Sequence, residues 1–461
     1  DEIGMVDARI ETVNDYEDPR PIREFFTRLV DSDPETAELL RASGPSRLVV
    51  VKPNWIQESH ETRPDVWEPL ITNPRVVIAV VESLAETMGG RGVICVCDAP
   101  HTYSDFAAIV ARGSLLAGID RVRRQWPSLQ VEVLDLRREV WIRKEQVVVE
   151  RRPNPEDPRG YVRLNLGRDS LFHGHRGEGR YYGADYDARV VNEHHRGDVH
   201  EYLLAGSPMV CDLFVNLPKL KTHKKTGLTC CLKNLVGING DKNWLPHHTE
   251  QAPAQGGDEF PDYPLARRME TVLKKAGRNV AVSVPVIGPW MYRKARKVGQ
   301  MALGDSETVI RNGNWQGNDT CWRMALDLNR ALLFGNPDGT WREPSGSAKR
   351  YLAMVDGIVG GQGNGPLCPD PAPSKVLFGG RNPATIDAVA ARLMDFDPDS
   401  LPIISGAFAS HRWPIADRSM DEIVVADGRR DGREIPLAEI EPAIPGGFEP
   451  HFGWTSLRRS A

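Results

Sequence analysis

Short, unbroken runs of apolar residues recur along this chain and alternate with segments of helical pattern. The runs Leu48–Val51, Val93–Val96 and Val131–Leu134 are separated by helical stretches at Arg75–Met88 and Phe106–Leu116. Strands that are apolar at every position are buried on both faces, which is typical of parallel sheets covered by helices. The alternation therefore predicts an α/β fold with a mostly parallel, doubly wound sheet.

The second half of the chain repeats the alternation. We expect strands at Met209–Val215, Tyr351–Val355 and Lys375–Phe378, and helices at Thr320–Leu333 and Pro383–Met394. Proline is well placed in the first turn of a helix, because the N–H that it lacks has no partner there. Both halves of the chain thus contribute to the predicted α/β architecture.

Differences in composition divide the 461 residues into five parts. The part between the two halves is rich in His, Tyr, Arg and Gly and has little hydrophobic period, so we expect a long insertion lying over the sheet. The expected parts are an N-terminal extension (1–45), a first α/β half (46–150), the insertion (151–206), a second α/β half with inserted helices and loops (207–420) and a C-terminal tail (421–461).

Charge and hydropathy exclude some classes of partner. The chain has 58 Lys and Arg against 63 Asp and Glu, a net charge of −5, whereas a general nucleic-acid binder is basic. No apolar run approaches the roughly 18 residues that span a bilayer. We therefore expect no nucleic acid and no membrane span. Seven irregularly spaced cysteines, and the lack of a signal-like opening segment, favour the reducing cytoplasm.

Polar side chains follow five of the predicted strands, at the edge where open α/β sheets bind ligands. At a single position a turn residue is the simpler interpretation, but lysines repeated after apolar strands favour a shared site. The residues concerned are Lys52, Asn54, Asp98, His101, Asn216, Lys219, Lys221, His223, Asp356 and Arg381.

The densest of these segments is Asn216–Gly240. We expect a short helix to begin near Thr226–Thr229 and to end near Gly237. Lysines ahead of a helix N-terminus form an anion site, and Lys219 and Lys221 share one side of an extended segment. The predicted ligand is a phosphate or carboxylate, and a solvated basic loop is the alternative. A lysine among other cations also loses its proton more easily and can act as a base or nucleophile.

Two further features carry weaker signals. His247 and His248 are candidate ligands for a divalent metal, although hydrogen-bonded histidines are the other interpretation, because the histidine spacings match no standard zinc pattern. The glycine-rich segment Gly360–Pro366 lacks the Lys-Ser/Thr of a phosphate-binding P-loop. It predicts a tight loop whose backbone N–H groups can approach a ligand.

Several motifs together resemble the family catalogued as domain of unknown function 362. They are Val51–Asn54, Asn216–His223, Leu232–Gly237, Val355–Ile358 with Gly365-Pro366, and Asn382-Pro383 with Asp387–Ala390. Many members of that family carry ferredoxin-like cysteine runs. This chain has no such run, so we expect no iron–sulfur cluster. The His- and Tyr-rich segment resembles a subgroup found near polysaccharide genes, which suggests a sugar-linked substrate.

Three functions fit this pattern. The first is an enzyme acting on a small anionic substrate, with or without a divalent metal. The alternatives are an isomerase resembling the nickel-pincer racemases, by fold analogy, and a non-catalytic protein that binds an anionic metabolite. In the enzyme, Lys221, His223, Asp98 and Asp356 would be catalytic, and Lys52, Asn54, Lys219, Lys233, Asn234 and Arg381 would bind substrate.

Overall fold

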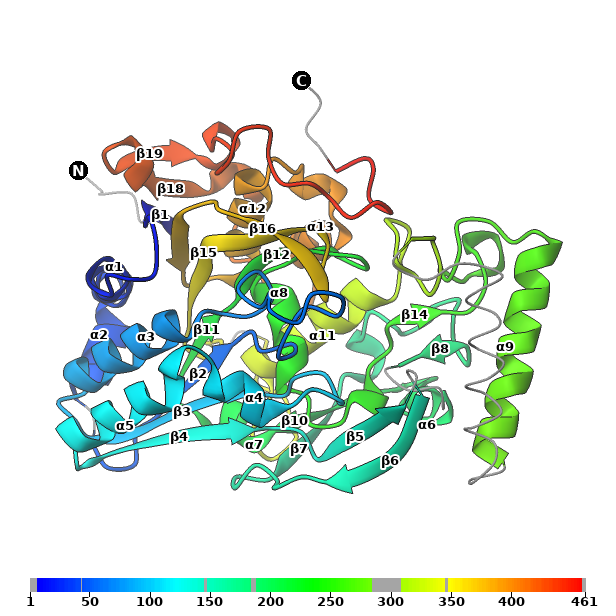
Figure 1. The fold of residues 1–461 in the computed structure, drawn as a ribbon, viewed down its shortest axis with the longest axis horizontal. Helices are drawn as coiled ribbons and strands as arrows, with labels where there is room; N and C mark the ends of the chain where they lie inside the picture. Colours follow the sequence, from blue (N-terminus) through cyan, green and yellow to red (C-terminus); the bar gives the residue numbers. More distant parts are fainter. Residues whose placement is uncertain are drawn as a thin grey trace.

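One twelve-stranded sheet runs through the computed structural model (Figure 1). Its centre is five parallel strands in the spatial order β4, β3, β2, β11, β15. Their bounds are Leu129–Asp135, Gly92–Asp98, Leu48–Pro53, Leu213–Leu217 and Tyr351–Asn364. The structure describes residues 6–42, 44–144, 147–183, 188–283, 308–344 and 347–457.

Helices cover both faces of this sheet, as the apolar strands require. On β2, Val49 and Val51 belong to one core and Leu48 and Val50 to the other, because successive side chains of a strand point to opposite faces. The first core lies against α1 (Arg20–Asp31), α2 (Pro34–Arg41), α3 (Pro74–Thr87) and α5 (Leu115–Gln125). The second lies against α8 (Cys231–Asn234), α11 (Cys321–Phe334), α12 (Pro383–Leu393) and α13 (Pro402–Phe408). The predicted α/β class with a mostly parallel sheet is confirmed.

The two ends of the chain complete one edge of the sheet. β17 (Val376–Gly380) runs antiparallel to β15, and β1 (Ala8–Thr12) lies between β17 and β18 (Val424–Asp427). β19 (Arg433–Pro436) closes the edge. The segments expected as an extension and a tail therefore each add strands to the main sheet.

Several predicted elements differ in their bounds. The strand predicted at Met209–Val215 begins two residues after α7 (Gly206–Val210), because Pro208 lies in that helical turn. The helix predicted at Phe106–Leu116 is split into α4 (Phe106–Ala111) and α5, since Gly113 adopts a positive φ of 54°.

The glycine-rich segment expected as a loop is largely strand. β15 continues through it to Asn364 and pairs with β16 (Cys368–Ala372), with Gly360 opposite Ala372. The strand tolerates these glycines because neighbouring backbone lies close: a Cβ on Gly361 would be 2.7 Å from the carbonyl oxygen of Pro69. Its N–H groups are therefore used by the sheet.

The insertion, together with segments that flank it, forms small sheets on the side of the molecule where α9 (Leu265–Ser283) lies (Figure 1). Asp327 of α11 anchors it by accepting hydrogen bonds from Ser170 Oγ (2.5 Å) and Tyr202 OH (3.2 Å). No helix among the described residues is long and apolar enough to cross a membrane. The small elements are β5 (Glu139–Lys144), β6 (Val147–Pro153), β7 (Tyr161–Asn165), β8 (Tyr181–Tyr182), α6 (Arg189–Glu193), β9 (His195–Arg196), β10 (Val199–Ala205) and β14 (His248–Thr249).

Candidate functional site

An ion pair lies at the carboxyl edge of the parallel strands. Lys52 at the end of β2 contacts Asp98 at the end of β3, with Nζ 2.7 Å from Oδ1, and both side chains are buried. The other oxygen of Asp98 accepts the backbone N–H of Trp55 at 2.7 Å. The parallel register places β2 and β3 side by side, so the polar residues that end them meet, as expected of such sheets.

Asn234 of α8 joins this pair to the next strand. Its Oδ1 accepts from Lys52 Nζ (3.2 Å) and Asn54 Nδ2 (2.8 Å), and its own Nδ2 donates to Asn216 of β11 (2.7 Å). Gly237 lets the chain after α8 approach this network, because a Cβ there would lie 1.9 Å from Asp98 Oδ1. The sequence predicted Gly237 as a helix end, whereas its role is this close approach.

A second buried ion pair lies at the same edge, on the other side of β11. Lys219, in β12 (Lys219–His223), contacts Asp356 of β15 at 2.8 Å, and both side chains are 0% exposed. Tyr16 OH donates to Asp356 Oδ1 (2.8 Å), and the N–H of Asn73 donates to Oδ2 (2.8 Å). The Asp356 carboxylate is thus committed to protein donors, and Lys219 is withdrawn from any ligand.

Four other lysines lie near these pairs but contact no carboxylate. Three of them donate only to backbone carbonyls or to an imidazole: Lys221 to Leu70, Lys225 to Asn312, His247 and the ring of His248, and Lys242 to Val236 and Asn239. The fourth, Lys233 of α8, is 8% exposed, and its Nζ makes no hydrogen bond or ion pair within the described ranges.

Burial lowers the pKa of each of these lysines, because it penalises the charged form. Desolvation, with the charges of Lys219 and Lys233, holds the pKa of Lys221 well below its ordinary value. Burial brings the pKa of Lys225 to about 8 and that of Lys242 to about 7. Desolvation also lowers the pKa of Lys233. A site with this much uncompensated positive charge is arranged to receive an anion.

Two imidazoles lie within the field of these lysines. Desolvation and the charges of Lys233 and Lys221 hold the pKa of His223 well below its usual range. Desolvation, with the charges of Lys233 and Lys225, lowers the pKa of His247 to about 3. Both rings are therefore neutral at pH 7.

Backbone contacts fix opposite tautomers in the two rings. His223 Nδ1 accepts the N–H of Lys225 at 3.0 Å, so the ring proton is on Nε2. His247 Nδ1 lies 2.8 Å from the carbonyl oxygen of Leu245, so the proton is on Nδ1 and Nε2 carries a lone pair. Neither Nε2 has a partner in the described part of the chain. One ring can therefore donate a hydrogen bond to a ligand, and the other can accept a proton.

The structure does not bring every candidate residue to this edge. Arg381 follows β17, which is antiparallel to β15, so it lies at the opposite edge of the sheet, 3.7 Å from Asp33. His248 stacks on Tyr182 with ring centroids 5.0 Å apart, and Lys225 Nζ lies 3.3 Å from its Nδ1. Because a cation already faces that nitrogen, the arrangement at His248 favours hydrogen bonding over metal ligation.

The helix predicted near Thr226–Thr229 is absent from its place. β13 (Gly227–Thr229) occupies that segment and forms a hairpin with β12. The helix that follows, α8, begins only at Cys231. Lys221 pairs with Thr229 across the hairpin, and strand pairing therefore outweighed the helical pattern.

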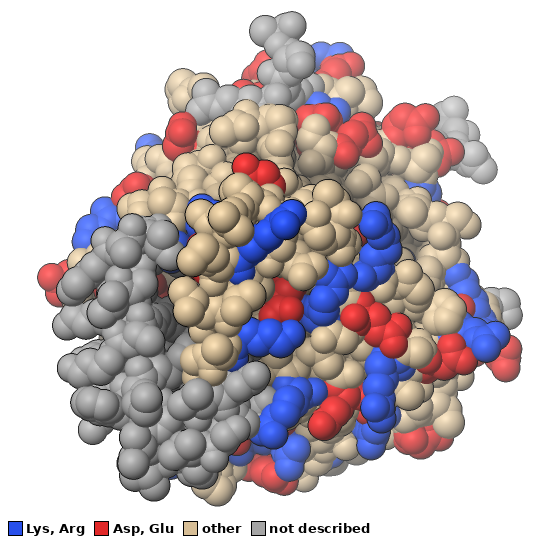
Figure 2. Space-filling model, turned by 90° about the vertical axis from the view of Figure 1, so that its right-hand side faces the viewer, with Lys and Arg blue, Asp and Glu red and all other residues tan. Residues whose placement is uncertain are grey.

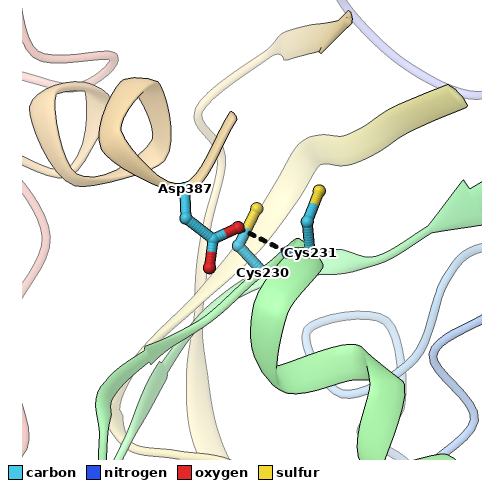
Figure 3. Close-up of side chains that lie close together, drawn as sticks. All are labelled: Cys230, Cys231 and Asp387. Atoms are coloured by element: carbon cyan, nitrogen blue, oxygen red, sulfur yellow. Dashed lines mark hydrogen bonds between the residues drawn. The ribbon is translucent and has the colours of Figure 1, made fainter. Parts of the chain in front are cut away.

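The start of α8 is held by a buried carboxylate (Figure 3). Asp387 Oδ1 accepts the N–H of Cys231 at 2.6 Å, and Oδ2 accepts that of Leu232 at 3.3 Å. Cys230, Cys231 and Asp387 are the one group of this kind in the described residues whose geometry could hold a metal ion.

The chemistry of this group fits an anchor better than a metal site. Both oxygens of Asp387 accept backbone N–H groups of α8, and desolvation raises the pKa of Asp387 to about 7. Asp387 thus fixes α8, which carries Lys233 and Asn234. Sequence reasoning missed this role, although Asp387 stood among the family motifs.

A separate hollow of about 610 Å³ lies beyond the ends of β3 and β4, lined in part by Tyr103, Arg137 and Trp141. None of the lysines described above lines it. The guanidinium of Arg137 is fully engaged with Asp135 and three backbone carbonyls. Because Arg137 already has these partners, the hollow offers an anion less uncompensated positive charge than the surroundings of Lys233 do.

Comparison with known proteins agrees with the motifs. Residues 173–392 match the family described as "Domain of unknown function (DUF362)", which confirms the predicted family. No curated protein matches the chain. A crystal structure of a Thermotoga maritima protein matches at 11% identity and a TM-score of 0.31, over 78% of this chain and 55% of that one. The chain thus spans about half the length of that protein.

Proposed function

We propose that this chain, which carries the DUF362 domain, is an enzyme that binds a small phosphate- or carboxylate-bearing substrate at Lys233. The observation that carries the proposal is the Lys233 ammonium, which is 8% exposed and has no partner among the described residues. A buried charge without a counter-ion is costly. A bound anion would supply that counter-ion.

Neighbouring groups would complete the binding of the anion. Lys221, Lys225 and Lys242 add positive charge. Their Nζ groups donate to backbone carbonyls, so among the described residues no carboxylate competes with the anion for them. The Nε2–H of His223 would donate a further hydrogen bond. Charge-assisted hydrogen bonds of this kind are short and strong, and phosphate and carboxylate oxygens suit them best.

Proton transfer is the chemistry that the histidines support. His247 presents an Nε2 lone pair. Desolvation and the charges of Lys233 and Lys225 lower its pKa, and a bound anion would raise that pKa by offsetting the lysine charges. It would then serve as a general base, with a lysine or the Nε2–H of His223 stabilising developing negative charge. Both carboxylates predicted as catalytic, Asp98 and Asp356, instead position lysines.

The same contacts favour an anion over a divalent cation at this edge. Asp98 is bound to Lys52 and to a backbone N–H, and Asp356 to Lys219, Tyr16 and Asn73. A cation would have to displace these donors within a field of unpaired lysines. We also propose a cytoplasmic location, because all seven cysteines are free and buried.

Titration calorimetry with inorganic phosphate, sulfate and pyrophosphate tests the binding step. Lys233→Met should weaken binding about ten- to a hundredfold, as expected for the loss of one charge-assisted hydrogen bond. Lys375→Met removes the same charge at an exposed position and should leave affinity unchanged. Equal affinities for the wild type and the Lys233 variant would contradict the proposal.

Catalysis is tested separately with a panel of sugar phosphates and carboxylates followed by NMR. His247→Gln should abolish conversion of any substrate found while leaving its binding within a few-fold of the wild type. Binding at Lys233 without conversion of any compound would favour the non-catalytic alternative.

A further inference from the structure

Helix α9 presents an apolar face that no described element covers. Leu265, Met269, Val272 and Leu273 are 72%, 57%, 66% and 68% exposed. Their spacing of four, three and one residues places them on one side of an α-helix. Large apolar side chains gathered in this way are unusual on a protein surface and mark an interaction site.

The opposite side of α9 is firmly attached to the protein. Glu270 contacts Arg267 within the helix (2.7 Å) and Arg311 from another segment (3.2 Å), and its side chain is 5% exposed. Thr271 Oγ1 lies 3.5 Å from Glu259 Oε2. The apolar face is therefore turned outward by a polar anchor on the inner side of the helix.

Two basic side chains lie along one edge of the apolar face. Arg268 and Lys275 are exposed and lie about 40° and 60° around the helix from Val272, on the same edge of the face. Glu270, the acidic residue of this segment, is buried and paired. Figure 2 looks onto this side of the molecule and shows a tan strip with Lys and Arg side chains along one border, among which Asp and Glu side chains also lie.

We propose that this face of α9 binds the surface of a membrane that contains anionic lipid. An apolar face with a basic edge is the pattern of helices that lie in the bilayer interface, where the apolar side enters the acyl region and the basic side contacts lipid headgroups. The charge at the edge of the face is the reason to commit to anionic lipid over a second copy of this chain, which would bring like charges together.

The attachment of α9 also connects this surface to the site at Lys233. Arg311 binds Glu270 of α9, and the carbonyl oxygen of the next residue, Asn312, accepts from Lys225 Nζ at 2.5 Å. On the same helix Lys275 lies 3.8 Å from Glu250, close after β14. A protein bound through α9 would hold the lysine-rich site near the membrane surface. The proposal does not depend on the reaction at that site.

Vesicle flotation tests the proposal with the full chain. The wild type should float with vesicles of phosphatidylcholine and phosphatidylglycerol about tenfold more than with phosphatidylcholine alone, because the basic edge contributes only with anionic lipid. Met269→Glu with Leu273→Glu should reduce flotation at least tenfold. Leu116→Glu, at another exposed apolar position (42% exposed) on α5, should float like the wild type.

Two further measurements keep the test decisive. Circular dichroism and thermal unfolding should match the wild type for both variants, since the replaced side chains are exposed. Wild-type protein that stays in the dense fraction with anionic vesicles would overturn the proposal. A wild-type dimer, seen by light scattering, that the double variant converts to monomer would overturn it too and assign the face to a second copy.

Discussion

Two groups of lysines lie at the same edge of the sheet and differ in their partners. Lys52 and Lys219 are buried against Asp98 and Asp356 at 2.7 and 2.8 Å. Lys233 and Lys221 are buried nearby with no carboxylate. Removing a charge from water costs several kcal/mol unless a partner compensates it. The ion pairs of the first group thus compensate its burial within the protein. Burial of the second group costs free energy, and a bound anion would reduce that cost.

The contrast separates lysines that residue type alone cannot tell apart. Lys219 and Lys233 both stood out in the sequence. β12 directs Lys219 to Asp356 of β15, whereas Lys233 on α8 has no partner among the residues that the structure describes. A buried lysine is available to bind a substrate only if no carboxylate of the protein already pairs with it. The first three predictions below test this distinction.

Breaking a paired lysine should have the largest effect on stability. Asp356→Asn leaves the Lys219 ammonium buried without its counter-ion, so the free energy of unfolding should fall by about 3–5 kcal/mol. Lys233→Met removes a charge that had no partner, so stability should be unchanged or higher. Urea denaturation followed by circular dichroism measures both, and similar losses in the two variants would erase the distinction.

Crowding the other paired lysine should have an intermediate effect. In Gly237→Ala the new Cβ would lie 1.9 Å from Asp98 Oδ1 and 2.6 Å from Lys52 Nζ, so the pair must shift. We expect a loss of about 1–3 kcal/mol in the free energy of unfolding, as for other overpacked sites. Gly44→Ala is the control, since nothing lies within 4 Å of its new Cβ. A neutral Gly237 variant would show that the pair is loosely held.

The unpaired lysines should make stability depend on pH. Burial lowers the pKa of Lys242 to about 7 and of Lys225 to about 8, from an ordinary value of 10.5. Between the folded pKa of each lysine and its ordinary value of 10.5, the unfolded chain binds more protons than the folded chain. The free energy of unfolding should therefore rise with pH. Below pH 7 both states are protonated, and the cost of burial is present in full.

For each lysine that is neutral in the folded chain and protonated in the unfolded chain, the free energy of unfolding should rise by about 1 kcal/mol per pH unit. Solvent screening reduces this value. Urea denaturation at pH 7, 8 and 9 measures it. Lys242→Met should flatten the curve, whereas Lys375→Met, at an exposed position, should not. A curve that is flat in the wild type would mean that these lysines are solvated.

Much of the fold was accessible from the sequence, because it depends on local patterns. Unbroken apolar runs predicted the central strands, and Asn382 with Pro383 marked the start of α12, where Asn382 Oδ1 accepts from the N–H groups of Ala384 and Thr385. The bounds were less accurate where pairing partners decide them. β15 runs past Val355 to Asn364 because β12 and β16 pair with its second part.

The site was only partly accessible, because ion pairing is a tertiary property. The sequence placed Lys52, Asn54, Asp98, Asn234, Lys221 and His223 at one edge, where the structure also places them. It could not show that Asp98 and Asp356 are occupied by lysines, nor that antiparallel β17 carries Arg381 to the far edge. Lys242 was overlooked because a single lysine in a loop has no pattern of its own.

The central claim is that the unpaired Lys233 ammonium receives an anion. A crystal of the protein soaked in selenate tests it most directly, because the anomalous signal of selenium locates the ion without a model. We predict a peak within hydrogen-bond distance of Lys233 Nζ and next to His223 in the wild type, and none there in Lys233→Met. A peak found only at exposed lysines or arginines, with Lys233 Nζ still unpartnered, would contradict the claim.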